Sequence, residues 1–411
     1  MIDVDEALRR IRAAAEPRDR VRVSLAEAAG RVLAEPVTVD RDAPPTDRSA
    51  MDGFAVRAAD ATAAGARLKI VGTAPAGRPS TATVESGSAV RIYTGGVLPD
   101  GADSVVMVEA TQEDDDGVVT LTEAVRAGQH VRRRGEDRRA GEPLLSAGRR
   151  IGAAEIAALA TVGASQVDVV RAPEVSVLST GDELIDAADD PEPHQVRNAN
   201  APMLGALVKR LGYPVRDLAR VGDDRARLRE AIEAGLEADL LLITGGVSVG
   251  DYDFVAETLE ACGVETLFHK VAMRPGKPVF AGRGSRGLVL GLPGNPVSAF
   301  TGCLVLGRPA LDALEGGDRS AVYQATAILT ESLRLRPGRR TYHLARVRSG
   351  RRGLEAAAAR TASSGDVLSL ERGNAFVVTE ADVPAPEAGD RVSVLWWDPF
   401  DPRARTSSMG G

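Results

Sequence analysis

Residues 268–299 read FHKVAMRPGKPVFAGRGSRGLVLGLPGNPVSA, and this stretch predicts a strand, a tight turn and a helix in succession. The apolar run GLVLGL is typical of a buried strand. The turn Pro293-Gly-Asn-Pro296 follows it, where Asn295 can cap a helix and proline fits the first helical position. We therefore expect a helix to begin at this turn and to continue into the apolar segment behind it.

Basic side chains gather in the same stretch. The chain has four lysines, of which Lys69 and Lys209 lie elsewhere, while Lys270 and Lys277 lie here with Arg274 between them. Lysine carries a compact ammonium, whereas arginine carries a planar guanidinium. Because the chain uses arginine almost everywhere else, two lysines in this stretch indicate that a compact ammonium is needed here. A helix N-terminus that faces a basic cluster favours an anion. We expect an anion site here.

Strands and helices alternate on both sides of this segment. The strand-like runs are EVSVLST, PVRDLARV, ADLLLITGG and GLVLGLPG, and helical spacing covers 199–212, 224–237, 252–262 and 296–315. This alternation predicts βαβ units and a mostly parallel, doubly wound sheet over 174–316. Such sheets bind ligands at the carboxyl ends of their strands.

Two further loops of this domain carry polar residues where a strand ends. In STGDEL, the acids Asp182 and Glu183 could hold Mg²⁺, which favours oxygen ligands and phosphate; a helix cap plus a solvated acid is the alternative. In TGGVSVGD, Gly245, Gly246 and Ser248 allow backbone N–H groups to approach a phosphate or pterin, and Asp253 follows. A plain tight turn explains the second loop equally well.

Two motif matches are misleading. Residues 282–287, GRGSRG, fit GxGxxG but lie between two strand-like runs, so they predict a hairpin turn and no dinucleotide site. Gly276-Lys277 is followed by Pro278, where a phosphate-binding P-loop needs serine or threonine.

The regions on either side of the α/β segment show different secondary-structure patterns. Helical spacing covers 2–16, 24–33 and 152–163, while 36–146 contains short strand-like runs rich in Val, Thr and Gly. From about 320 onward, short strands alternate with turns, which is typical of a small β-barrel or sandwich.

The β-rich part carries its own polar motifs. DRSAMDGFA contains Asp52 before Gly53 in a predicted turn, where a purely structural aspartate is the alternative. YTGG contains Thr94, and VRRRGEDR contains Arg132 and Asp137. Three adjacent arginines could clamp a phosphate, although a solvated charge run is the usual explanation of such a segment.

Composition excludes several classes of function. The chain has 411 residues, 44% of them hydrophobic and 27% charged, which fits a soluble protein of roughly two to three domains. A net charge of −7 argues against nonspecific binding to nucleic acid or to an acidic membrane surface. Cys262 and Cys303 have no disulfide or metal-ligand spacing, and the N-terminus is unlike a signal peptide. We find no apolar run of membrane-spanning length and expect a cytoplasmic protein.

Taken together, the motifs resemble one known family. SAMDGFAV, YTGG, RRRGED, STGDEL, TGGVSVGDYD, MRPGKP and LPGNPVSA occur in the order and spacing of the molybdopterin molybdenumtransferase (MoeA) family, which includes the gephyrin E-domain. The resemblance covers essentially the whole chain. Seven motifs in register make an accidental match very improbable.

The resemblance implies a fold and its division into domains. It implies a central doubly wound α/β domain of the molybdopterin-binding type, a β-rich N-terminal domain, a helical linking domain and a C-terminal small β-barrel. The expected domains are 1–45 plus 139–172 for the linking domain, 46–138 for the β-rich domain, 173–318 for the α/β domain and 319–411 for the barrel.

It also implies an activity: insertion of molybdenum from molybdate into adenylylated molybdopterin with release of AMP, assisted by Mg²⁺. The expected enzyme is a homodimer whose active site lies between the α/β domain of one subunit and the β-rich domain of the other. Expected partners are the molybdopterin adenylyltransferase and the apo-molybdoenzymes or their chaperones. Two alternatives stay open: an adenylyltransferase-like enzyme, and a scaffold or non-catalytic paralogue of the same fold.

The resemblance places the site residue by residue. The expected catalytic residues are Asp52, Thr94, Asp137, Glu183, Asp223 and Asp253. The expected metal ligands are Asp182, Glu183, Asp223 and Asp253. The expected anion and substrate contacts are Arg132, Gly245, Gly246, Ser248, Lys270, Arg274, Lys277, Pro293, Asn295, Pro296 and Ser298, with Ser363 and Ser364 as weaker ones.

The chain departs from the family pattern at two positions. Arg274 stands where some relatives have lysine, and Phe54 where many have tyrosine. In addition, the sequence GDD allows either Asp223 or Asp224 to be the aligned acid.

Overall fold

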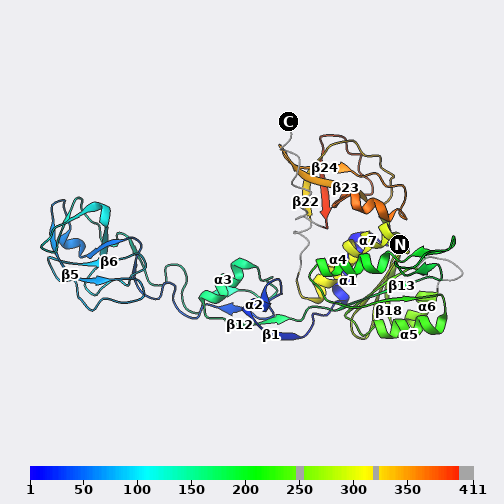
Figure 1. Ribbon diagram of the computed structural model, residues 1–411, viewed down its shortest axis with the longest axis horizontal. Helices are drawn as coiled ribbons and strands as arrows, with labels where there is room; N and C mark the ends of the chain where they lie inside the picture. Colours follow the sequence, from blue (N-terminus) through cyan, green and yellow to red (C-terminus); the bar gives the residue numbers. More distant parts are fainter. Residues whose placement is uncertain (247–253, 318–323, 398–411) are drawn as a thin grey trace.

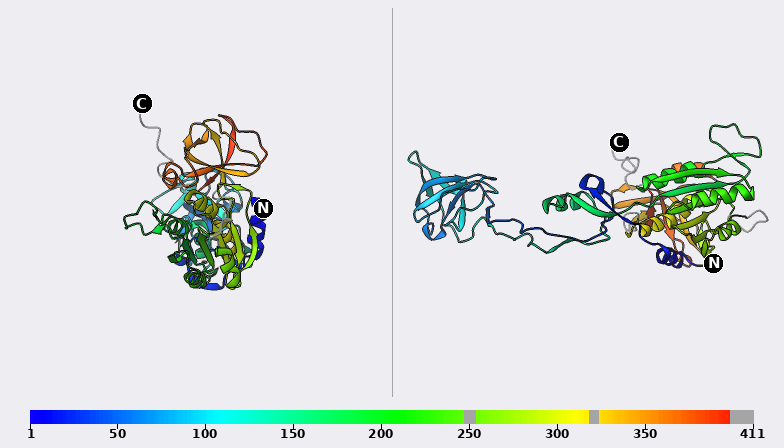
Figure 2. Two further views of the ribbon diagram at one scale, coloured as in Figure 1. Left: turned by 90° about the vertical axis from the view of Figure 1, so that its right-hand side faces the viewer. Right: turned by 90° about the horizontal axis from the view of Figure 1, so that it is seen from below.

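The computed structural model describes residues 1–246, 254–317 and 324–397 and shows an elongated molecule (Figure 1). The β-rich domain lies at one end, and the α/β domain with the C-terminal barrel lies at the other. A small linking unit lies between them, and the right-hand view of Figure 2 shows the same arrangement. Two strands on the way to the β-rich domain, β2 (Val37–Thr38) and β11 (Pro143–Leu145), pair antiparallel.

The α/β domain is built on a six-stranded sheet of order β16-β13-β17-β21-β20-β18. Its strands are β13 (Val175–Thr180), β16 (Val215–Val221), β17 (Leu240–Thr244), β18 (Glu265–His269), β20 (Phe280–Arg283) and β21 (Leu288–Leu292). The strands β16, β13, β17 and β21 are parallel, and β20 runs antiparallel to both of its neighbours, β21 and β18. The predicted mostly parallel sheet is thus confirmed.

Helices cover both faces of this sheet. They are α4 (Asn200–Arg210) and α7 (Pro296–Gly302) on one face, and α5 (Arg225–Gly235) and α6 (Phe254–Ala261) on the other. Successive residues of β17 alternate between two cores: Leu240 and Leu242 pack with the first pair of helices, Leu241 and Ile243 with the second. A strand buried on both faces explains the unbroken apolar run LLLI.

The helix that begins at Pro296 is long. It continues from α7 through a π-helical segment (Cys303–Gly307) into α8 (Arg308–Leu314). Pro296–Leu314 is apolar and long enough to cross a membrane by length and composition, contrary to the expectation from sequence, but 94% of its apolar window is buried inside the fold. It is therefore a core helix of the α/β domain.

The GxGxxG match is a hairpin, as predicted. Gly284 N donates to Gly287 O over 2.8 Å, and β20 and β21 pair antiparallel on either side. A Cβ at Gly287 would lie 1.9 Å from the carbonyl oxygen of Asp239, so only glycine fits this close approach.

The C-terminal region is a closed barrel. Its strands are β22 (Gln324–Leu329), β23 (Arg340–Gly350), β24 (Gly353–Ala358), β25 (Ala375–Thr379) and β26 (Arg391–Trp396), and β23 pairs with both β24 and β25 to close the ring. Strand β19 (Met273–Arg274) of the α/β domain adds to β23 and ties the two domains together.

The β-rich domain has a six-stranded sheet of order β7-β4-β6-β5-β9-β8. Its strands are β4 (Gly53–Val56), β5 (Arg67–Ala74), β6 (Ser88–Ile92), β7 (Ser104–Met107), β8 (Thr111–Glu113) and β9 (Val118–Leu121). The linking unit consists of β1 (Arg20–Ser24), β12 (Gln166–Val170), α2 (Leu25–Ala28) and α3 (Ala153–Thr161).

Two local predictions differ from the structure. The helix expected over 24–33 is only the single turn of α2, because Gly30 takes a φ of 80° and Leu33 then bridges to Val169 of β12. Helix α1 (Val4–Ala14) forms as predicted, but its apolar face packs into the α/β core, although the expected domains place it in the linking unit. The periodicity of the sequence predicts that α1 has an apolar face, but it does not predict which domain that face packs against.

Candidate functional site

A cavity of about 880 Å³ opens at the carboxyl ends of β13, β17 and β21. The three loops singled out from the sequence meet here, at the edge where doubly wound sheets bind ligands. The lining residues are Thr180, Gly181, Glu183, Leu184, Val196, Arg197, Asn198, Ala199, Asn200, Asp223, Thr244, Gly245, Gly246, Pro278, Pro293, Gly294, Asn295, Pro296, Gly365 and Val367. The last two come from the barrel, so both domains contribute to the wall.

The glycines of the second loop allow close packing of backbone at the cavity. Gly245 takes a φ of 91°, and a Cβ there would lie 2.5 Å from the carbonyl oxygen of Thr180. Gly246 also has a positive φ, of 59°. Both residues therefore place main-chain atoms at the cavity wall, as expected for a loop that approaches a phosphate or a flat ring. Ser248 and Asp253, predicted from the same loop, lie outside the described residues.

Two of the predicted acids line the cavity, and a third does not. Glu183 and Asp223 are lining residues. Asp182 is not, and its Oδ1 accepts a hydrogen bond from Asp223 N over 2.9 Å. Asp182 thus holds the loop that carries Asp223. The adjacent Asp224 caps α5 by accepting from Arg227 N over 2.8 Å, so of the two aligned alternatives only Asp223 faces the cavity.

The acids fit a divalent cation that is shared with a substrate. Within residues 1–246, 254–317 and 324–397, no group of three or more His, Cys, Asp or Glu side chains has the geometry to hold a metal ion. Mg²⁺ in phosphate-transfer sites is commonly bound through one or two carboxylates plus substrate phosphates. The pair Glu183 and Asp223 matches that smaller requirement.

The Pro293–Pro296 turn forms one wall of the cavity. Pro296 occupies the first helical position, as predicted, and Pro293, Asn295 and Pro296 all line the cavity. The side chain of Asn295 does not cap the helix, however. Its Nδ2 donates to Ser364 Oγ over 3.0 Å, which ties the turn to the barrel.

The three predicted serines near this turn do not line the cavity. Ser298 is buried, at 4% exposure, and does not line the cavity. Ser364 holds the turn, since its backbone oxygen also accepts from Val297 N over 3.1 Å. Ser363 Oγ accepts from Gly365 N over 3.2 Å and so shapes the loop that brings Gly365 to the cavity.

The predicted lysines flank a segment that contributes Pro278 to the cavity wall. Lys277 is exposed and adjoins the lining residue Pro278, while Lys270 is half-buried with a φ of 65°. Lys270 N donates to Val279 O over 2.8 Å, which fixes this unusual backbone. Neither ammonium has an ion-pair partner in the part of the chain that the structure describes.

Arg274 belongs to a cluster of cations that sequence reasoning missed. Its Nη1 donates to Arg336 O over 2.9 Å. Burial lowers the pKa of Arg274, and the positive charges of Arg339 and Arg336 lower it further. Among the described residues, none of these three guanidiniums has a carboxylate partner, whereas the neighbouring Arg340 pairs with Asp5 and Glu380. The arginine-rich run RPGRR at 336–340 was the available signal.

In the β-rich domain, local pairing brings the three predicted motifs together. Strand β3 (Arg48–Ser49) pairs with β10 (Val131–Arg132), and Gly95 N donates to Ser49 O over 2.8 Å. Asp52 Oδ1 then accepts from Thr94 N over 2.6 Å and from Thr94 Oγ1 over 2.8 Å. These hydrogen bonds, the backbone one first, lower the pKa of Asp52 below its ordinary value.

The three adjacent arginines, Arg132, Arg133 and Arg134, each bind a different acid. Arg132 forms an ion pair with Asp137. Arg133 Nη1 donates to Asp47 over 2.7 Å, and Arg134 Nε donates to Asp42 over 2.6 Å. The predicted clamp of three arginines is therefore not what forms, because Arg133 and Arg134 fix the loop. Arg132, paired with Asp137, is the one of the three whose partner also belongs to the predicted site.

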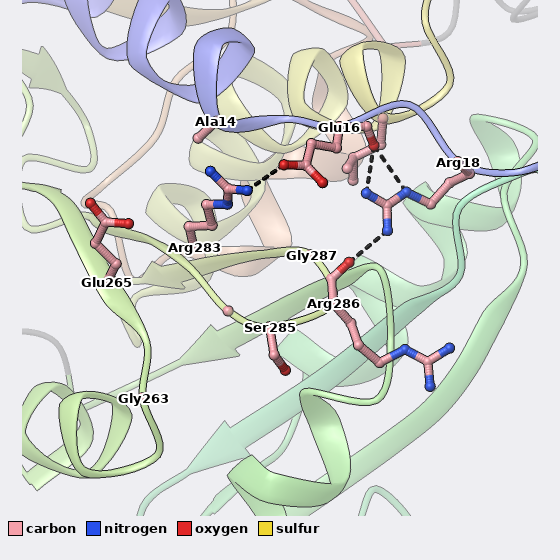
Figure 3. A pocket seen from close by; sticks show the side chains of 11 residues that line it. Ala14, Glu16, Arg18, Gly263, Glu265, Arg283, Ser285, Arg286 and Gly287 are labelled. Carbon is pink, nitrogen blue, oxygen red and sulfur yellow. Dashed lines mark hydrogen bonds and ion pairs between the residues drawn. The ribbon is translucent and has the colours of Figure 1, made fainter.

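A second cavity, of about 320 Å³, lies beside the β20–β21 hairpin (Figure 3). Its arginines are already engaged: Arg283 pairs with Glu16, Arg286 with Glu237, and Arg18 Nη1 donates to Arg286 O over 2.6 Å and to Asp239 Oδ1 over 3.2 Å. With its cations neutralised, this cavity offers no unbalanced positive charge to an anion.

Comparison with known proteins assigns each region of the chain. Residues 2–163 match the family described as "MoeA N-terminal region (domain I and II)". Residues 176–313 match the "Probable molybdopterin binding domain", and residues 326–397 the "MoeA C-terminal region (domain IV)".

Relatives match along nearly the whole length. Molybdopterin molybdenumtransferase of Bacillus subtilis is 35% identical over 402 residues, which is 96% of this chain and 94% of that protein. The protein of the same name from Haemophilus influenzae is 34% identical, covering 92% of this chain and 93% of the other. The crystal structure of the molybdopterin biosynthesis moeA protein from Pyrococcus horikoshii OT3 superposes with a TM-score of 0.83 at 28% identity, over 96% of this chain and 100% of that one. The chain therefore belongs to the molybdopterin molybdenumtransferase (MoeA) family.

Proposed function

We propose that this protein inserts molybdenum from molybdate into adenylylated molybdopterin and releases AMP, the last step in building the molybdenum cofactor. The observation that carries the proposal is the cavity at the sheet edge, where Glu183 and Asp223 face glycine-rich backbone and the PGNP turn. Family membership and the names of the relatives support the same activity.

The α/β domain supplies groups suited to a phosphoanhydride. Main-chain atoms of Gly245 and Gly246 lie at the wall, where backbone N–H groups can meet phosphate oxygens. Glu183 and Asp223 would hold Mg²⁺, which when bound neutralises phosphate charge and favours departure of AMP. Asp182 keeps Asp223 in place through its hydrogen bond to the backbone of that residue. These side chains orient the phosphates, and no covalent nucleophile is required.

The basic side chains beside the cavity suit molybdate, which is an oxyanion. Lys277 and Lys270 provide ammonium groups without described acid partners, and Arg274 adds a guanidinium beside Arg336 and Arg339. A local positive field in a protein of net charge −7 concentrates an anion at this site and raises its rate of association. The lysine-retaining segment thus forms the anion-collecting side of the proposed site.

The β-rich motifs point to a homodimer with a shared active site. The β-rich domain, which carries Asp52, Thr94 and Arg132, lies at the opposite end of the elongated chain from the α/β domain (Figure 1). Exposed apolar side chains flank both regions: Met51 is 41% and Tyr93 44% exposed beside Asp52, and Leu368, next to the lining residue Val367, is 79% exposed. A second subunit that brings its β-rich domain to the cavity would cover these side chains and complete the site.

Two other functions fit less of the chain. An adenylyltransferase-like enzyme accounts for the molybdopterin-binding domain alone, whereas matched MoeA regions flank that domain on both sides. A scaffold or non-catalytic paralogue needs no acids in the cavity, yet Glu183 and Asp223 are present there. We place the enzyme in the cytoplasm, with the molybdopterin adenylyltransferase and the apo-molybdoenzymes or their chaperones as partners.

The direct test is product formation. Purified protein is given adenylylated molybdopterin, Mg²⁺ and molybdate, and AMP is measured together with reconstitution of an apo-molybdoenzyme. The proposal predicts AMP release that depends on molybdate and an active molybdoenzyme. Absence of both products, in protein shown to be folded, would remove the transferase assignment.

A further inference from the structure

Asn200 is a buried polar residue at the cavity that the proposed mechanism does not use. It is the first residue of α4 and a lining residue, with only 8% of its surface exposed. Its Nδ2 donates to the backbone oxygen of Gly294 over 2.8 Å. Because a carbonyl oxygen only accepts, the nitrogen of the amide must face Gly294, and Oδ1 must face the other way.

The oxygen of this amide has no donor. Asn200 Oδ1 is buried and receives no hydrogen bond from any residue that the structure describes. The nearby Asn198 differs, since its Oδ1 accepts from Ala201 N over 3.2 Å. A buried acceptor that is left unpaired lowers stability, and in native proteins such an atom calls for an explanation.

The chemistry of the substrate limits which group can donate a hydrogen bond to Asn200 Oδ1. Phosphate and molybdate are acceptors at neutral pH, so their oxygens would be repelled by Oδ1. Among the groups of the proposed substrate, the donor therefore belongs to a part other than the phosphates. The pterin ring carries an exocyclic amino group, and flat heterocycles are held by a few placed polar groups in an otherwise apolar cavity.

We infer that Asn200 Oδ1 accepts a hydrogen bond from the exocyclic amino group of the bound pterin, which makes Asn200 a specificity-determining residue. The inference rests on the proposed function and adds to it the edge of the substrate that is recognised. The bond between Nδ2 and Gly294 O holds the amide in place, so recognition of the ring is tied to the position of the PGNP turn.

The test uses two small probes that differ in one group. The affinity of the full-length protein is measured for 6-hydroxymethylpterin and for 6-hydroxymethyllumazine, in which a carbonyl oxygen replaces the amino group. We expect the wild type to prefer the pterin by about 10-fold, as one hydrogen bond to an otherwise orphaned acceptor supports. Asn200→Leu, of similar volume, should bind both probes alike.

The control is Ser176→Ala. Ser176 Oγ is likewise buried without a partner, but it lies outside the cavity lining, so its removal should leave the preference intact. If Asn200→Leu does not fold, the same two probes are measured with Asn200→Ala, which adds no atoms to the site. A wild type with no preference, or an Asn200 variant that keeps it, would overturn the inference. AMP release by the same wild-type preparation would show that the transferase activity stands even then.

Discussion

Asp52 accepts two hydrogen bonds from Thr94, one from the backbone nitrogen over 2.6 Å and one from the hydroxyl over 2.8 Å. Hydrogen bonds to an ionised carboxylate stabilise its charged form, which is why the pKa of Asp52 is held below its ordinary value. The carboxylate is therefore charged at neutral pH and held in a fixed orientation. That is the state needed to act on a substrate or on a cation.

The first prediction concerns this charge. Asp52→Asn keeps the shape and the acceptor oxygen but removes the charge, and we expect kcat for AMP release to fall by about 100-fold, in the range of one lost electrostatic contact in a transition state. Asp116→Asn, an exposed acid of the same domain, is the control and should leave kcat unchanged. Equal rates for both variants and the wild type would mean that Asp52 takes no part in catalysis.

The second prediction separates the three acids near the cavity. Glu183→Gln and Asp223→Asn should raise the Mg²⁺ concentration for half-maximal AMP release by about 10-fold, because each removes one carboxylate from the cavity. Asp182→Asn should change it little, since an amide oxygen still accepts from Asp223 N. A Mg²⁺ titration of the four proteins makes the comparison. If Asp182→Asn shows the largest shift, Asp182 is itself a ligand.

The third prediction concerns the lysines. Lys277→Ala should raise KM for molybdate by about 10-fold and weaken its dependence on ionic strength, because one cation is lost from the anion-collecting side of the site. Lys209→Ala, at the exposed end of α4, removes the same charge away from the cavity and serves as the control. Steady-state rates at two salt concentrations test this; an identical KM for Lys277→Ala and the wild type would contradict it.

The fourth prediction concerns stability and pH. Asp239 anchors two segments that connect the α/β domain to the linking unit: Arg171 donates to both carboxylate oxygens, each over 2.9 Å, and Arg18 Nη1 donates to one over 3.2 Å. Burial alone would raise the pKa of Asp239, but the hydrogen bonds from Arg171 and from Glu174 N, with the charges of Arg171 and Arg18, outweigh it and lower the pKa.

The sign of the pH effect follows from this shift. A lowered pKa means that the ionised carboxylate stabilises the fold above its unfolded pKa, and that this contribution is lost as the pH falls through the folded value. Asp239→Asn should therefore destabilise the protein by about 3 kcal/mol at pH 7, as for a buried ion pair that loses one partner. The difference from the wild type should shrink below pH 4, which denaturation at several pH values would measure. Glu16→Gln, which breaks an exposed pair, should cost less than about 1 kcal/mol at either pH.

Much of the fold and of the cavity could be predicted from local patterns. The apolar run 288–292 and the turn at Pro293–Pro296 marked a buried strand and a helix start, because proline and glycine constrain the backbone directly. The loops after the parallel strands were predicted to meet because the topology places their carboxyl ends together.

What could not be predicted depended on partners distant in the sequence. Asparagine is a common helix cap, but the side chain of Asn295 instead donates a hydrogen bond to Ser364 of the barrel. Arg336 and Arg339 join Arg274 only because β19 adds to a barrel strand. Asn200 was not predicted because it stands out only by a buried oxygen that accepts no hydrogen bond, and a sequence does not show which atoms are hydrogen-bonded.

The shared active site is the central claim, and mixed dimers test it most directly. Asp52→Asn and Lys277→Ala each damage both sites of a homodimer, but a mixed dimer would pair the intact β-rich domain of one chain with the intact α/β domain of the other. After unfolding and refolding an equal mixture, and with molybdate well below the wild-type KM so that both parent variants are slow, we expect AMP release at about a quarter of the wild-type rate, since half of the dimers would be mixed and each would have one intact site. A rate no higher than the mean of the two parent variants would contradict a site built from two subunits.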